Sequence, residues 1–77
     1  MSIGEHERAI LTRDVPEKGL VAGDVGTVVS VHDGDDRPAG YTLEFFSLSG
    51  ETLAVVAVTA DAVRPVGPRE VTHARAM

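Results

Sequence analysis

Cysteine and tryptophan are both absent from this sequence, and its aromatic residues are limited to one tyrosine and two phenylalanines. Without a thiol the chain has no disulfide and no zinc-thiolate site, which excludes the disulfide-stabilised class of small secreted proteins. Residues 1–7 contain no basic stretch and no apolar run, so a signal peptide is not expected. The longest nearly apolar run, residues 53–58, is too short to span a bilayer. We therefore expect a cytoplasmic protein that does not bind membranes.

Positive charge is also scarce. The chain carries seven basic and twelve acidic side chains, for a net charge of −5, and the basic ones are scattered singly along it. A nucleic-acid-binding protein needs a basic patch that displaces counterions from phosphates. The charge therefore argues against a nucleic-acid partner and favours a protein partner that is neutral or basic.

Valine is plentiful, in short segments separated by glycine, proline and aspartate. Short β-branched segments between turn residues are typical of β-strands. The predicted strands cover residues 8–12, 27–32, 41–46, 51–59 and 64–66, and a single helical turn covers 61–63. Asp61 is expected to cap that turn by bonding its first N–H groups. Pro65 places the last strand at a sheet edge, because proline has no N–H to donate to a neighbour.

These elements predict an all-β fold, namely a small five-stranded SH3-like barrel with a one-turn helix before the last strand. An OB-fold is the competing prediction, but it normally has a longer chain and a helix between its third and fourth strands. The 77 residues leave room for one domain. We place the barrel at residues 7–66, between a flexible N-terminus at 1–6 and a flexible C-terminal tail at 67–77.

Alternation along the strands predicts which side chains form the core, because every second residue lines the same face. The residues expected to face inward are Val25, Val29 and Val31 of the second strand and Tyr41, Leu43 and Phe45 of the third. Glu44 then points outward, and Phe46 has the same parity.

A tight turn is predicted at Gly23, Asp24 and Gly26. The Asp24 carboxylate can accept a backbone N–H within the turn, and either glycine can supply a positive φ or allow a close backbone approach. We interpret these three residues as structural, since they direct the second strand into the core.

The same residues carry a resemblance to a known family. The matching pattern is Leu20-x-x-Gly23-Asp24-x-Gly26-Thr27-Val28-Val29, followed by Tyr41-x-Leu43-Glu44-Phe45 and Gly50-Glu51-Thr52. It resembles a family of small uncharacterised bacterial proteins classed as a domain of unknown function, and no catalytic residue comes with that resemblance. The turn is also similar to that of KOW-type modules in ribosomal and transcription proteins. That second likeness implies an alternative function, a nucleic-acid- or ribosome-associated barrel.

No constellation of residues predicts catalysis. His32 and the acidic loop 33–36 could bind a cation, but the alternating ligands of a calcium loop are missing, so a solvated loop is the better interpretation. Asp24 and Glu44 are explained by the turn and by strand alternation rather than by acid–base chemistry. We therefore expect no enzyme activity, no catalytic residue, no metal and no cofactor.

The strand 51–59 offers the best candidate for function, because both of its faces are apolar between Leu53 and Val58. In a small lone barrel one face of a strand normally meets water, and exposed apolar area often marks a contact surface. The structural alternative is that the first loop or a terminus covers this face. The candidate partner-binding residues, on an outer face around Phe46 and Val56, are Phe46, Leu53, Val56 and Val58. They predict a non-enzymatic interaction module, an accessory or antitoxin-like protein that binds another protein or a second copy of itself.

Overall fold

Strands account for most of residues 3–67, the part of the chain that the computed structural model describes. Two short 3-10 helices, η1 and η2, interrupt them. In chain order the elements are β1 (Arg8–Leu11), η1 (Pro16–Lys18), β2 (Val25–Asp33), β3 (Pro38–Phe46), β4 (Thr52–Thr59), η2 (Ala60–Ala62) and β5 (Val63–Pro65). The all-β class, the five strands and the short helical turn before the last strand are therefore confirmed.

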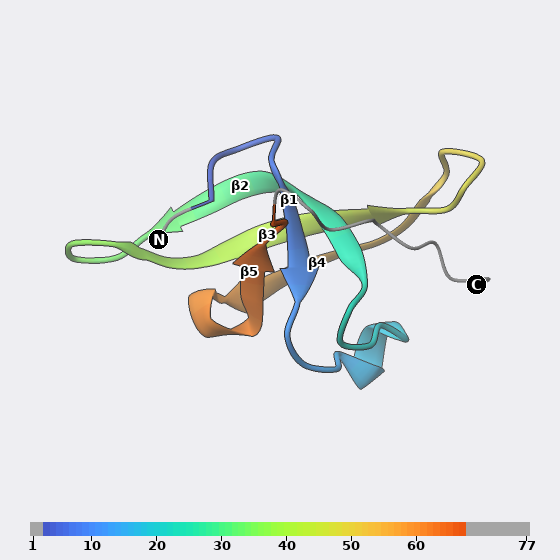
Figure 1. Cartoon of the computed structure of the whole chain (residues 1–77), viewed down its shortest axis with the longest axis horizontal. Helices are drawn as coiled ribbons and strands as arrows, with labels where there is room; N and C mark the ends of the chain where they lie inside the picture. Colours follow the sequence, from blue (N-terminus) through green and yellow to red (C-terminus); the bar gives the residue numbers. More distant parts are fainter. Residues whose placement is uncertain (1–2, 68–77) are drawn as a thin grey trace.

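The five strands form one antiparallel sheet in the order β4-β3-β2-β1-β5. In Figure 1 the long strands β2 and β3 run side by side, and β1 and β5 cross them steeply, so the sheet is strongly twisted. β4 and β5 are its two edges, and the edge position of β5 agrees with Pro65. No pairing between β4 and β5 closes the sheet within residues 3–67, and the SH3-like barrel stays a prediction.

The core is built mainly from β1, β3 and the first loop. Its largest fully buried side chains are Leu11, Leu20, Val28 and Leu43. The inward placement of Tyr41, Leu43 and Phe45 is confirmed, since all three are buried. Val15 and Leu20 bracket η1 and exchange both backbone hydrogen bonds, at 2.9 and 3.1 Å from N to O, so the first loop closes on itself.

The core residues of β2 differ from the predicted set of Val25, Val29 and Val31, since Val25 is only half-buried and lies outside the core cluster. Val28 is fully buried, whereas Val29 is 37% exposed. Val28 lies opposite Leu43 and Ser30 lies opposite Thr42, so Val29 is the extra residue of a β-bulge. The bulge shifts the alternation by one residue, which is why Val31 packs against the core as expected and Val29 does not.

The segment before β1 lies against the sheet. The Ile3 side chain is buried in the core, and its N–H donates to the Tyr41 hydroxyl at 3.3 Å. The His6 N–H donates to the Val28 carbonyl at 2.7 Å. Residues 3–6, part of the predicted flexible N-terminus, therefore contribute to the fold. The predicted tail, residues 67–77, lies outside the described residues except for Gly67. Over residues 3–67 no helix has the length and apolar character needed to cross a membrane.

Candidate functional site

The turn before β2 is held by hydrogen bonds on both of its sides. Gly23 has a φ of +96°, in the left-handed region that favours glycine. The Asp24 carboxylate accepts the Val21 N–H at 3.0 Å. The carbonyl of Leu11 accepts the Gly23 N–H at 2.8 Å, and the Leu11 N–H donates to the Asp24 carbonyl at 2.9 Å. These bonds join the turn to the end of β1, which is a structural role.

Gly26 lies directly against the aromatic ring of Phe45. A Cβ atom at residue 26 would be 2.9 Å from two carbons of that ring, which is closer than real Cβ atoms come to other atoms. The second glycine of the turn is therefore required for space rather than for backbone conformation, and it lets β2 approach the core side of β3.

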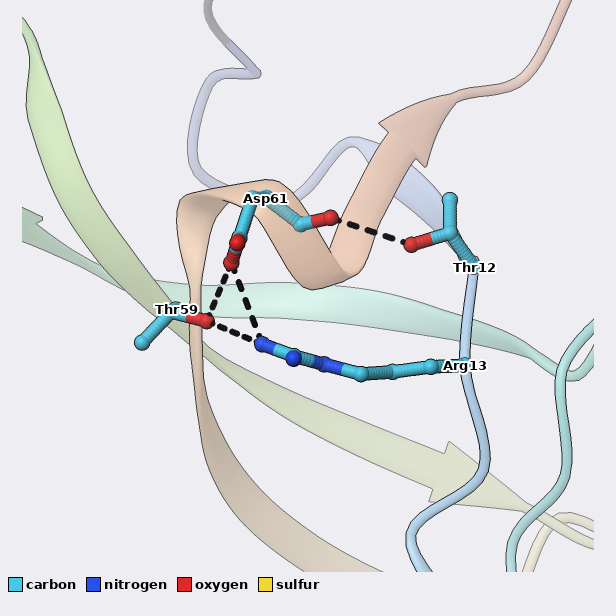
Figure 2. A network of polar contacts seen from close by, with 4 residues as sticks. All are labelled: Thr12, Arg13, Thr59 and Asp61. Atoms are coloured by element: carbon cyan, nitrogen blue, oxygen red, sulfur yellow. Dashed lines mark hydrogen bonds and ion pairs between the residues drawn. The ribbon is translucent and has the colours of Figure 1, made fainter.

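A polar network ties the segment after β1 to η2 (Figure 2). The Arg13 guanidinium donates from Nη2 to the Thr59 hydroxyl at 2.6 Å and to the Asp61 carboxylate at 3.1 Å. The Thr59 hydroxyl in turn donates to the same carboxylate at 2.5 Å. The Thr12 hydroxyl donates to the Asp61 carbonyl at 3.1 Å. All four residues are exposed, so the network orients η2 at the surface.

The network corrects the predicted role of Asp61. The residue at the N-cap of η2 is Thr59, and no side chain caps that helix. Asp61 lies within the turn, where its carboxylate meets Arg13 and Thr59 instead of the first N–H groups. The sequence could not show this, because Arg13 is 48 positions away and reaches Asp61 only in the folded chain.

The hydrogen bond from Thr59, and after it the charge of Arg13, lower the pKa of Asp61 below its ordinary value of 3.8. Because the folded-state pKa is below the unfolded one, the ionised carboxylate stabilises the fold above pH 3.8, and this contribution is lost as the pH falls through the lowered pKa. We expect Asp61→Asn to lower the melting temperature at neutral pH by a small amount, since the group is at the surface. The difference from the wild type should vanish on acidification below the lowered pKa. Thermal melts from pH 7 downward measure it, and a difference that grows with acid would contradict the assignment.

Apolar side chains gather on the outward side of the β3–β4 hairpin. Phe46 is 48% exposed, Leu53 40% and Val55 49%. Val55 lies opposite Glu44, which shares its face of β3 with Phe46. We call Phe46, Leu53 and Val55 the outer β4 face. It lies at the edge of the sheet, because β4 has only one neighbouring strand in the described part of the chain.

Only two of the four predicted partner-binding residues, Phe46 and Leu53, belong to this face. Val56 and Val58 instead pack against the core, opposite the buried Leu43 and Tyr41. Successive residues of a strand point to opposite sides, so a side chain next to Val55 has to point inward. The outward residue that the prediction missed is Val55. The strand is apolar at both parities, so alternation alone gives no sign of which side faces water.

The hairpin register that exposes this face contains a second bulge. Phe45 lies opposite Ala54, but Phe46 lies opposite Thr52, which leaves Leu53 as the extra residue of β4. The Thr52 hydroxyl donates to the Glu44 carboxylate at 2.5 Å. The Glu44 carboxylate, on the same side of the hairpin as Phe46 and Val55, thus accepts a hydrogen bond from within the hairpin.

A groove of about 730 Å³ opens on another part of the surface, beside η2. Its walls come from the first residues described, from the β2–β3 loop, from β3, and from the chain between Thr59 and Pro65. The lining residues are Ile3, Asp36, Arg37, Pro38, Ala39, Tyr41, Thr59, Ala60, Asp61, Val63 and Pro65. None of the predicted partner-binding residues lines it. Its ionisable lining residues are of both signs, so its charge favours no class of ligand.

A family model described as a domain of unknown function (DUF4926) matches residues 5–65. The chain belongs to this family. The match confirms the resemblance to a domain of unknown function, and it covers every strand from β1 to β5. No curated protein and no solved structure matches the chain.

The DUF4926 match contains the structural turn, the Arg13 network and the whole outer β4 face. Of the described residues, only 3, 4, 66 and 67 lie outside it. The groove draws on a residue beyond the DUF4926 match, since Ile3 lines it. The outer β4 face and the turn are complete within the family domain.

Proposed function

We propose that this DUF4926 domain is a non-enzymatic protein-interaction module, of an accessory or antitoxin-like kind, that binds another protein chain through the outer β4 face. The observation that carries the proposal is the exposure of Phe46, Leu53 and Val55 on one side of two neighbouring strands. Single exposed apolar side chains are normal on a protein surface, but a group of them on one face is typical of a contact surface.

The electrostatics of the face support the same function. The protein is acidic overall, with a net charge of −5, yet β4 contains no charged residue from Thr52 to Thr59. Burying a charge that has no countercharge costs roughly several kcal/mol of binding free energy. A partner can cover the uncharged strand without that cost, and the Glu44 carboxylate opposite Val55, which accepts the Thr52 hydroxyl, favours a neutral or basic group on the partner.

The proposal is tested by a lysine at the centre of the face and a lysine elsewhere. Val55→Lys should weaken binding to the partner at least tenfold, about 1.4 kcal/mol, because the ammonium has to be buried in the contact. Val21→Lys is the matched control, since Val21 is also exposed, at 39%, but lies before the Gly23 turn and off the hairpin. Binding is measured by capture from a native extract and by light scattering of the purified chain. If Val55→Lys behaves like Val21→Lys in both measurements, the proposal is wrong.

A further inference from the structure

The two edges of the sheet are protected very differently. β5 is three residues long and contains Pro65, and both features discourage pairing with another strand. β4 is eight residues long and contains no proline, no lysine and no other charge, so none of the usual protecting residues is present. Its bulge is confined to the Thr52–Leu53 end, which leaves Ala54–Thr59 in regular pairing with β3.

β4 therefore presents a regular backbone edge. Every second N–H and C=O of an edge strand points away from its one neighbour, and a further strand is the structure that satisfies these groups in a row. The apolar side chains above this edge belong to the outer β4 face, so the outward side chains of an added strand would lie beside them and bury part of their surface.

We infer that the added strand is β4 of a second copy of this chain, paired antiparallel about a two-fold axis at Val55; the inference rests on the proposed function and names its partner. A two-fold axis between antiparallel strands sets one residue opposite itself and keeps outward side chains outward. With Val55 at the axis, Ala54 lies opposite Val56 of the other copy within the regular stretch, and the bulged Leu53 adjoins Ala57 of the other copy. Both members of each pair are apolar.

Charge favours a second copy in the antiparallel direction. One end of β4 adjoins the exposed Glu51, and the other end, at Thr59, adjoins the neutral ion pair of Arg13 with Asp61. The antiparallel pair brings the Glu51 end of each copy to the Arg13–Asp61 ion pair of the other, so the two Glu51 side chains stay at opposite ends. A parallel pair would instead set Glu51 beside Glu51. Because two copies of net charge −5 repel each other, they associate best along an uncharged strand in the direction that keeps the Glu51 side chains apart.

Single-cysteine variants test this arrangement, since the natural sequence has no cysteine. In the proposed pair the two Val55 Cα atoms are about 5 Å apart, within disulfide range. The two Leu53 Cα atoms are four residues out of register, about 14 Å apart, and out of range. Val55→Cys should form a covalent dimer under mild oxidant at least tenfold faster than Leu53→Cys. The two residues share a strand and a face and have similar exposure, so Leu53→Cys is the matched control.

A second set of variants tests the same register and leaves Val55, the residue at the two-fold axis, unchanged. The double variant Leu53→Cys/Ala57→Cys should crosslink rapidly, because residue 53 of each copy adjoins residue 57 of the other, whereas Leu53→Cys and Ala57→Cys alone should not. Light scattering of the wild type should show a dimer that dissociates on dilution and that Val55→Lys abolishes. Equal crosslinking rates for Val55→Cys and Leu53→Cys, or a wild type that is monomeric at every concentration, would overturn the inference. If that monomeric wild type still captures a different protein, and Val55→Lys prevents it, only the second copy is wrong and the proposed function stands.

Discussion

Leu43→Ala is expected to remove most of the free energy of unfolding of this domain at 25 °C. The Leu43 side chain has no exposed surface and lies at the centre of the core, between Val28 on β2 and Val56 on β4. Truncating a buried leucine removes apolar transfer free energy and leaves a cavity, at a combined cost of about 2–5 kcal/mol. A domain of this size has a free energy of unfolding of only roughly 3–5 kcal/mol. Urea denaturation followed by circular dichroism should show a strongly lowered urea midpoint with a shortened folded baseline.

Leu48→Ala is the control for this prediction, because it makes the same substitution in the turn that joins β3 to β4. Leu48 is 89% exposed, so its truncation should change the free energy of unfolding by about 0.5 kcal/mol or less. Comparable urea midpoints for the two variants would contradict the placement of Leu43 in the core.

Gly26→Ala is expected to destabilise the fold by about 1–3 kcal/mol, although it adds only one methyl group. The new Cβ would lie 2.9 Å from two ring carbons of Phe45, which is itself buried and has little room to move. Either the ring leaves its position or β2 moves away from β3. The expected result is a lower urea midpoint with an unchanged slope, because the amount of surface exposed on unfolding stays the same.

A double-mutant cycle identifies the contact responsible. Phe45→Leu removes the ring that obstructs the alanine, so Gly26→Ala should cost less in the Phe45→Leu background than in the wild type. We expect a coupling of at least about 0.5 kcal/mol between the two sites. If Gly26→Ala costs the same in both backgrounds, the glycine is required for another reason, such as backbone conformation.

Part of the candidate site could be predicted from residue types alone. Phe46 follows the alternation of β3, in which Glu44 is polar and therefore faces water, and its outward position agrees with that pattern. On β4 the pattern fails, because residues of both parities are apolar. Which of them face outward depends on the pairing with β3. Val56 lies opposite the buried Leu43 and therefore points inward, so Val55 next to it is exposed.

The sequence by itself determined the all-β class, the number of strands, the helical turn before β5 and the core face of β3. These features follow from β-branched segments, turn residues and polar–apolar alternation, all of which are local. Only the tertiary structure decided the two bulges, the partner of Asp61 and the outward side of β4. Each of these depends on a strand or side chain that is distant in the sequence. A bulge can be recognised only from the register with the partner strand. Asp61 reaches Arg13 only after η2 has docked. Which side of β4 faces the core is set only when β4 pairs with β3.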